Sequence, residues 1–593
     1  MSARPRPGAD PIATQLVKGA LRSAQLEMET LLARTAMSAF IREKKDFFVA
    51  LFGPAGEMVV GTSIPIFGGM IEPVLEHYPR AEMQPGDLYW YNDCYASKGA
   101  VSHSPDQVFI APVFAEGQLS GFALSWAHFN DIGGLRPGSL SPDATDIFQE
   151  GIIVPPIRLV RAGETNQDAL RVFVRNSRFP HMVTGDIRAA TAAVRLGERR
   201  LGEMFARFGR ASVLEAFAAL IAETRGVVAR RMRDTVPPGR YAFAEAVDSD
   251  GQGHGPFAIR MALEVGNRAV LDASASDDQA PGPINFIMHP DVPKLVLGIY
   301  FLSDEPSALL NHGALAALDE VKTRPGSLLA PRFPAPLGQR GMTLMRTSAA
   351  CLGLLAVATG GKAVASGNVY VIYYLRGIAD AAGTRFLLTD GIAVGYGARA
   401  FADGIDAVYL VANENYPAEF MDLSYPVRLL RYAINPDSGG PGRWRGGCGV
   451  IREIEVLAEE AMLSIRIDGV TNPPWGVGGG LNGRGGRCTV NPDRPDRREV
   501  APVSDGTVVR RGDVVRIETG GGGGFGHPFE REPARVLADV LGGFVSVESA
   551  RADYGVALTK DGSAIDAAAT AALRRTRTPA ALFHRKVYRE RME

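Results

Sequence analysis

Two short stretches of the sequence place a histidine three residues before an aspartate. The first is His103-Ser-Pro-Asp106 and the second is His128-Phe-Asn-Asp131. Imidazole nitrogen and carboxylate oxygen together suit Zn, Mn or Fe(II). Two histidines and one carboxylate would leave coordination positions open for water or substrate, which distinguishes a catalytic metal site from a structural one. The residue types therefore indicate a candidate catalytic metal site.

Spacing alone leaves other interpretations open. A His-x-x-Asp pair also arises by chance, and His103 could simply cap a turn. Asp131 stands before Gly133-Gly134 and could form only an Asx turn. The segments between the two pairs, VFIAPVF and LSGFALSWA, are predicted to be adjacent antiparallel strands. That pairing would return the second His-Asp pair to the same end of the sheet as the first.

Other polar residues lie in the same loop-rich part of the chain. Each could be a general base or support one, and each could equally be structural. Asp93 follows a predicted strand, and Glu150 lies in the segment DATDIFQEG. We keep Asp93 and Glu150 as candidate catalytic residues. Further polar candidates are Asp143, His181 and Arg188.

A run of glycines, TGGGGGFG, extends from Thr519 to Gly526 after the predicted strand VVRIE. It formally satisfies GxGxxG, but a polyglycine run satisfies almost any glycine pattern. The segment TGGK at residues 359–362 lacks the other residues of a Walker A motif, so we predict no ATP site in this chain. The run could form an anion nest for a phosphorylated intermediate, or only a flexible loop or tight turn. The candidate substrate-binding residues are Gly133, Gly134, Gly522, Gly523, Gly524 and His527.

Hydrophobic periodicity predicts the elements that must position these residues. A helix is expected over residues 10–36, with Asp10 as its cap, and two or three helices over 187–235. Shorter helices are expected near 291–302, 349–358 and 532–541. Predicted strands include FFVALFG, EMVVG, LYWYN, VYVIYYL and VYLVA. Two hairpins are predicted, AIRMALEV with AVLDASA and GVIREIEVL with AMLSIRIDGV.

Composition excludes several classes of protein. The chain has 593 residues, of which 46% are hydrophobic and 22% charged, so it is globular rather than disordered. Its net charge of −1 argues against nucleic acid as the main partner. Four cysteines without a CxxC pair fit a reducing compartment. No signal peptide or membrane span is visible, so we expect a cytoplasmic protein with no membrane partner.

A series of motifs in fixed order resembles the hydantoinase B family, also called the HyuB or N-methylhydantoinase B family. The motifs extend over residues 10–560 and include PGDLYWYNDCY, HSPD, AHFNDIGG, RPGSLSPDATDIFQEG, SGGPGRWRGGCGVIREI and GGGGGFGHPFERE. The family contains subunits of ATP-dependent hydantoinases, oxoprolinase and caprolactamase, with related subunits in acetone and acetophenone carboxylases. The resemblance implies a mixed α/β fold with a large interleaved β-sheet core.

The resemblance also implies roles for the residues. The metal ligands would be His103, Asp106 and His128, and Asp131 would be an additional ligand or a catalytic group that orients a histidine. An A-type partner with an actin-like ATPase fold would bind ATP and Mg and phosphorylate the substrate, in a heterotetramer or larger assembly. We expect three regions: a metal-site region at 10–235, a β-rich region with glycine loops at 236–545, and a tail at 546–593 of partial order.

The sequence departs from the family pattern near the expected pocket. Family members often read HIPVHLG where this chain has TSIPIFG at residues 62–68, and Ala127 and Phe129 replace other residues beside His128. These changes leave the substrate open. We expect metal-assisted opening of a cyclic amide such as a hydantoin, oxoproline or a lactam. The alternatives are a subunit of an ATP-dependent ketone carboxylase and a non-catalytic scaffold.

Overall fold

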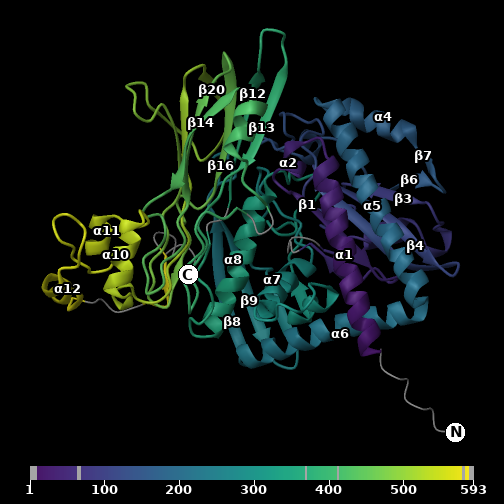
Figure 1. The fold of residues 1–593 in the computed structure, drawn as a ribbon, viewed down its shortest axis with the longest axis horizontal. Helices are drawn as coiled ribbons and strands as arrows, with labels where there is room; N and C mark the ends of the chain where they lie inside the picture. Colours follow the sequence, from purple (N-terminus) through teal and green to yellow (C-terminus); the bar gives the residue numbers. More distant parts are fainter. Residues whose placement is uncertain (1–9, 63–67, 368–369, 410–412, 577–580, 586–593) are drawn as a thin grey trace, which may run out of the picture.

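The structure is a computed structural model that describes residues 10–62, 68–367, 370–409, 413–576 and 581–585. Within these ranges the strands form sheets of seven, four, four and five strands, together with one two-stranded sheet. Helices cover or separate the sheets (Figure 1). The expectation of a mixed α/β fold is therefore confirmed, although the β-structure is divided among several sheets instead of one large interleaved sheet.

The N-terminal sheet has the strand order β2-β1-β5-β4-β3-β6-β7. Strands β4 and β5 pair as the sequence predicted, with Asp106 directly opposite His128. They are joined by Glu116 and Gly117, whose φ angles of 52° and 71° suit the tight turn of a two-residue hairpin. The strand bounds are β1 Phe47–Phe52, β2 Met58–Gly61, β3 Leu88–Tyr91, β4 Asp106–Ala115, β5 Gln118–His128, β6 Ile157–Arg161 and β7 Glu164–Thr165.

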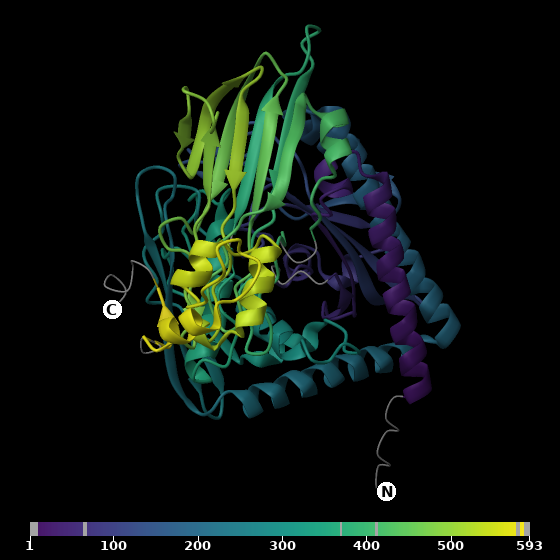
Figure 2. The ribbon, with the colours of Figure 1, turned by 60° about the vertical axis from the view of Figure 1, so that its left-hand side comes forward.

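Long helices cover one face of this sheet (Figures 1 and 2). They are α1 (Pro11–Thr35) and α5 (Pro180–Phe208), whereas the long helix α6 (Arg210–Thr235) runs along the base of the molecule and packs against α1. Asp10 caps α1 as predicted, because its carboxylate accepts a hydrogen bond from the Ile12 amide at 3.0 Å. Successive residues of β4 point alternately toward the helices and toward a second apolar cluster on the opposite face of the sheet. Because both faces are buried, the sequence of β4 is an almost continuous apolar run. Shorter helices in this half are α2 (Ala39–Arg42), α3 (Glu72–His77) and α4 (Gln167–Asn176).

A second unit packs the sheet β11-β10-β9-β8 against α7 (Asp291–Leu302) and α8 (Arg340–Ala358). The hairpin of β9 (Phe257–Val265) and β10 (Ala269–Asp272) was predicted and is present. Strand β8 spans Gly239–Val247 and β11 spans Glu320–Lys322. Helix α8 begins nine residues before its predicted start, because its first turns carry polar side chains whose burial the apolar pattern does not indicate. By length and composition α8 could cross a membrane, but 78% of its apolar window is buried inside the protein, as in a core helix.

Two further sheets enclose a shared apolar core. One has the order β13-β12-β16-β20 and the other β14-β15-β21-β18-β19. The predicted hairpin of β15 with β16 is wrong, because the short link between these strands crosses from one sheet to the other. The strand bounds are β12 Val371–Ile378, β13 Arg385–Gly391, β14 Val427–Ile434, β15 Val450–Val456, β16 Glu460–Ile467, β18 Arg487–Val490, β19 Arg498–Val500, β20 Val503–Arg510 and β21 Val514–Glu518.

The predicted strand at residues 408–412 lies partly outside the described residues, and Val408 forms only an isolated bridge with Val394. Helix α9 covers Ala418–Ser424. At the C-terminal end, α10 (Pro533–Leu541) is followed by α11 (Val547–Ala552) and α12 (Ala567–Arg574), which bury a small core of their own. The expected tail therefore contains two short helices among its described residues. Strand β22 (Phe583–His584) pairs with β17 (Gly476–Val477). The expected boundaries at residues 235 and 545 stay a prediction.

Candidate metal centre

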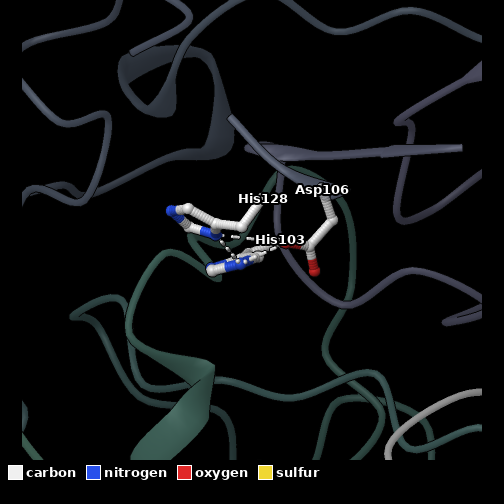
Figure 3. A group of neighbouring side chains, drawn as sticks. All are labelled: His103, Asp106 and His128. Atoms are coloured by element: carbon white, nitrogen blue, oxygen red, sulfur yellow. Dashed lines mark hydrogen bonds and ion pairs between the residues drawn. The ribbon is translucent and has the colours of Figure 1, made fainter. Parts of the chain in front are cut away.

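The ends of β4 and β5 bring His103, Asp106 and His128 together. Asp106 is the first residue of β4 and His128 the last of β5, and the two are direct partners in the register. His103 returns to them through a tight turn, in which the Asp106 amide donates to the His103 carbonyl at 3.2 Å. Figure 3 shows the three side chains converging, and all three are buried. We call these residues the triad.

The distances within the triad fit a shared cation. His103 Nε2 lies 2.7 Å from Asp106 Oδ1 and 3.1 Å from His128 Nδ1, and the last pair, His128 Nδ1 and Asp106 Oδ1, is 3.3 Å apart. Two atoms that each bind Zn²⁺ at about 2.1 Å with tetrahedral or octahedral angles lie about 3.0–3.4 Å apart. The three atoms are thus spaced much as ligands of one ion would be, and Figure 3 shows that the two ring nitrogens face each other.

The hydrogen-bond partner of the outer nitrogen of His103 supports the same arrangement. His103 Nδ1 lies 3.4 Å from the carbonyl oxygen of Gly338, a group that can only accept. A proton on Nδ1 leaves the lone pair of Nε2 directed at the other two triad atoms. Orientation of a histidine by a backbone carbonyl is the usual support for a metal ligand.

The charge states are also those of metal ligands. Burial, helped by the Arg340 guanidinium, lowers the pKa of His103 to about 4, so its imidazole is neutral at pH 7. Burial alone would raise the pKa of Asp106, but the neighbouring His103, His128 and Arg340 outweigh it and hold that pKa below its ordinary value. Neutral imidazole and ionised carboxylate are the forms that bind a divalent metal.

Arg340, at the start of α8, fixes the carboxylate from another part of the chain. Its Nε donates to Ser102 Oγ at 2.6 Å, and one terminal nitrogen lies 3.4 Å from Asp106 Oδ2. The sequence provided no reason to single out Arg340, since it is 234 residues from Asp106.

A small cavity of about 50 Å³ adjoins the triad. His103, His128 and Arg340 line it, and the remaining lining is Phe40, Asp46, Trp126, Leu140, Gly341, Leu344, Met345, Tyr370, Ile372 and Tyr409. The sequence did not point to Asp46, which reaches the site because its backbone carbonyl accepts from the His128 amide at 3.2 Å. Burial and, more weakly, the charge of Asp106 raise the pKa of Asp46. A bound cation would favour its ionised form, so Asp46 could supply a further oxygen ligand.

Asp131, expected to be a ligand or catalytic group, is bound elsewhere. Its buried carboxylate accepts from the Arg178 amide at 2.8 Å, the Arg178 guanidinium at 2.9 Å and the Gly138 amide at 3.0 Å. These bonds hold a loop against the start of α5, so the observed contacts of Asp131 are those of a structural anchor, and its expected role at the metal stays a prediction. The same loop contains Gly133 and Gly134 at φ angles of 92° and 81°, where a Cβ would meet backbone oxygen atoms within 3 Å. Tight packing is sufficient to account for both glycines, and their expected contact with substrate stays a prediction.

Glu150 supports the triad indirectly. Its buried carboxylate accepts hydrogen bonds from the Leu337 amide at 2.8 Å and the Gly338 amide at 2.6 Å. Gly338 is the residue whose carbonyl faces His103, so Glu150 is a positioning residue, and these bonds place its carboxylate against backbone amides instead of the cavity. Asp93 caps a turn, with Oδ1 accepting from Tyr95 and Ala96 amides at 3.0 and 2.9 Å. Neither arrangement supports the direct catalytic role that we expected.

The glycine run is packed too closely to be an anion nest. The amides of Gly522, Gly523 and Gly524 donate to carbonyls of Gly447, Ser366 and Leu481 at 2.8–2.9 Å. A Cβ on any of the three would lie 2.0–2.2 Å from backbone atoms of other segments. The N–H groups of these three glycines are therefore already used in backbone hydrogen bonds, which do not support the expected substrate contact; that contact stays a prediction. His527 caps a short helical turn, since its Nδ1 accepts from the Phe529 amide at 3.1 Å.

Other sequence candidates also lie away from the triad. Asp143 forms an ion pair with Arg136, and His181 is exposed at the start of α5. Ala127 and Phe129 face the apolar core under the helices, so they do not shape the cavity. In the segment 62–68, residues 63–67 lie outside the described residues.

Comparison with known proteins gives a consistent result. A family model described as hydantoinase B/oxoprolinase matches residues 10–528. The putative D-/L-hydantoinase B subunit of Pseudomonas sp. (strain NS671) is 30% identical, over 95% of this chain and 98% of its own length. The caprolactamase beta subunit of Pseudomonas jessenii is 31% identical, over 95% of this chain and 99% of its own length.

Solved structures share the fold. The crystal structure of the ATP-dependent caprolactamase from Pseudomonas jessenii matches with a TM-score of 0.83 at 28% identity, covering 96% of this chain and 100% of that chain. A nucleotide-free acetone carboxylase structure matches with a TM-score of 0.81, covering 96% of this chain and 84% of that chain; at 20% identity it shows the fold alone. With a family match over most of its length and relatives that align from end to end, the chain belongs to the hydantoinase B/oxoprolinase family.

Proposed function

We propose that this chain is the B-type component of an ATP-dependent amidohydrolase that opens a cyclic amide, such as a hydantoin, oxoproline or a lactam, at a divalent metal. The observation that carries the proposal is the buried triad of two imidazole nitrogens and one carboxylate oxygen, all within 4.8 Å of one another. A bound Zn²⁺, Mn²⁺ or Fe²⁺ would polarise a carbonyl and lower the pKa of water toward 7. Arg340 and the Gly338 carbonyl hold Asp106 and His103 in the orientation that such an ion needs.

The shape of the cavity supports a small uncharged ring as substrate. Its volume of about 50 Å³ has room for about four water molecules, which is the size of one small ring. Most of the lining side chains are apolar or aromatic. Arg340 is the one guanidinium among the lining residues, and Ser102 and Asp106 already engage it. Among the proposed substrates this favours a hydantoin or a simple lactam over oxoproline, whose carboxylate would need a cationic partner in the cavity.

An energy source on a partner chain would complete the reaction. The chain has no Walker A motif, and its glycine run is structural. The names of two relatives mark them as the B or beta components of larger enzymes, and the caprolactamase structure is titled ATP-dependent. We propose that an A-type partner binds ATP and Mg and phosphorylates the amide oxygen, which activates the amide carbon. Water then adds to that carbon, the ring nitrogen leaves as the amine, and hydrolysis of the resulting acyl phosphate releases inorganic phosphate. We expect a heterotetramer or larger assembly.

We also propose that the protein is located in the cytoplasm. All four cysteines are buried and unpaired, which suits a reducing compartment. We propose neither a nucleic-acid partner nor a membrane partner.

Because the fold is similar to that of acetone carboxylase, we also consider a second function, that of a ketone carboxylase subunit. The two reactions differ in what enters the product. Hydrolysis incorporates at least one oxygen atom from ¹⁸O-labelled water into the product carboxylate, whereas carboxylation requires bicarbonate and adds its carbon. Mass spectrometry of the product distinguishes the two reactions.

The decisive experiment co-expresses the chain with its A-type partner and measures metal content and ATP-dependent ring opening together. His103→Ala and His128→Ala should each lose the metal and the turnover. The matched control is His254→Ala, because His254 also pairs with an aspartate, Asp250 at 2.9 Å, but is half-exposed and outside the cavity. Metal that stays bound after both triad changes would exclude the site, and turnover without metal would favour the scaffold alternative.

A further inference from the structure

Three separate parts of the chain meet around the cavity. The N-terminal sheet contributes His103 and His128, the first turn of α8 contributes Arg340 and Gly341, and the segment entering β12 contributes Tyr370. Tyr370 lies more than 240 residues after the triad in the sequence, and no catalytic motif includes it. It brings a hydroxyl group to a wall that is otherwise mostly apolar.

Backbone contacts fix the position of Tyr370. Its carbonyl accepts from the Asp468 amide at 3.2 Å, and the next residues pair with β16. The ring lies against Gly341, where a Cβ would be 2.9 Å from Cε2 and 3.1 Å from Cζ of the tyrosine. Only glycine at position 341 leaves room for the end of the ring that carries the hydroxyl, beside Arg340.

The hydroxyl of Tyr370 has no hydrogen-bond partner among the described residues. Burial raises the pKa of Tyr370, so the phenol keeps its proton and can donate at neutral pH. Arg340 and Arg466 are the nearby cations that act on it, and both favour negative charge at this place. Because Tyr370 lines the cavity, a ligand there can supply the missing acceptor.

The other tyrosine of the cavity wall is directed elsewhere. The hydroxyl of Tyr409 lies over Gly391, only 2.1 Å from the position that a Cβ would take there, and its ring packs near the ammonium of Lys44. Gly391 is not part of the cavity lining. Tyr370 is therefore the better placed of the two hydroxyls to meet a ligand.

We propose that the Tyr370 hydroxyl donates a hydrogen bond to the oxygen atom of the species bound at the triad and stabilises the negative charge that develops on it. This inference rests on the proposed function, since it needs an amide carbonyl or phosphoryl oxygen in the cavity. Tyr370 is then a catalytic residue of the oxyanion-hole type. Removing one such donor lowers kcat by about 10²–10³-fold in other enzymes.

The test compares Tyr370→Phe with Tyr374→Phe. Tyr374 is the matched control because it lies in β12, a short way further along the same segment, has a buried hydroxyl without a partner among the described residues, and does not line the cavity. Each variant is loaded with Co²⁺ and titrated with inorganic phosphate, and the visible spectrum of Co²⁺ reports binding. We expect unchanged Co²⁺ stoichiometry in both, and an affinity for phosphate about tenfold or more lower in Tyr370→Phe alone.

The possible results distinguish a failure of the Tyr370 inference from a failure of the proposed function. Equal phosphate affinities in wild type and Tyr370→Phe, or no phosphate binding in a Co²⁺-loaded wild type, would overturn the role of Tyr370 and leave the metal site intact. Loss of Co²⁺ in Tyr370→Phe would show a structural role instead. Failure of the wild type to bind Co²⁺ would refute the proposed function itself. In the two-subunit enzyme, Tyr370→Phe should lower kcat far more than it changes KM.

Discussion

Buried carboxylates in this protein have different roles because their partners differ. Asp106 meets two imidazoles and a guanidinium, and so remains ionised and available to a metal. Asp131 is neutralised by Arg178, and its oxygens are used by a loop. Glu150 has no cationic partner among the described residues and accepts only from backbone amides of Leu337 and Gly338. The partner, more than the residue type, decides whether a carboxylate binds a ligand, anchors a loop or positions a neighbour.

Glu150 gives a prediction about pH. Burial raises the pKa of Glu150 to about 8, although the backbone hydrogen bonds oppose the shift. The folded chain then holds this proton more tightly than the unfolded chain, in which the pKa is near 4.5. The stability that Glu150 contributes should therefore fall as pH rises from about 4.5 to about 8. Glu150→Gln should weaken this fall, which thermal unfolding midpoints of both proteins across the range can measure.

The control for this prediction is Asp143→Asn, which changes a carboxylate in a partly exposed ion pair with Arg136. It should leave the decline between pH 4.5 and 8 as it is in the wild type. A Glu150→Gln protein with the same decline as the wild type would show that Glu150 is ionised in the fold.

The sequence identified the triad but not its surroundings, for a physical reason. His103, Asp106 and His128 lie within 26 residues on one predicted hairpin, so local spacing brings them together. Asp46, Arg340 and Tyr370 join them only through tertiary packing, which one sequence does not reveal. Asp131 shares a motif with His128 and Glu150 lies in the next motif along the chain, yet the hydrogen bonds of both carboxyl groups go to the loops around the triad.

At the scale of the elements, the glycine run packs between other backbone segments, a role that its composition alone did not indicate. An extended chain without side chains can pass between other backbone segments and bond to them on several sides, as residues 520–526 do. The density of glycines correctly predicted a close approach of the backbone to another group, but it did not indicate which group. A phosphate was one expectation, and backbone carbonyl groups occupy that place. The wrong prediction of a hairpin between β15 and β16 has the same cause, because the local sequence pattern indicates a strand but not the strands with which it pairs.

Two glycine-to-alanine changes test this packing. In Gly522→Ala the new Cβ would lie 2.2 Å from backbone atoms of Tyr396, so we expect destabilisation by several kcal/mol or failure to fold. Gly202→Ala is the control, because Gly202 lies within α5 with nothing within 4 Å of a Cβ. There alanine should stabilise the helix by about 0.5–1 kcal/mol. Thermal unfolding of both variants measures the difference, and a stable Gly522→Ala protein would contradict the close packing.

At the scale of the whole molecule, the cavity lies where three parts of the fold meet. Its lining comes from the N-terminal sheet, from α8 beneath the second sheet and from β12 of the third. This arrangement suits the proposed function, in which the chain receives an activated substrate from a partner chain.

The division of labour between two subunits predicts an uncoupled enzyme. If the partner phosphorylates the amide and the triad only completes the reaction, His103→Ala in this chain should still allow substrate-dependent formation of ADP. Ring-opened product should fall by about 10²-fold or more, because activation of water at the metal is lost. The ratio of ADP to product, measured in the reconstituted complex, should therefore rise steeply from near one in the wild type. His254→Ala should keep the wild-type ratio. A parallel loss of ADP and product in His103→Ala would mean that the triad takes part in the ATP-dependent step as well, and the proposed order of events would have to be abandoned.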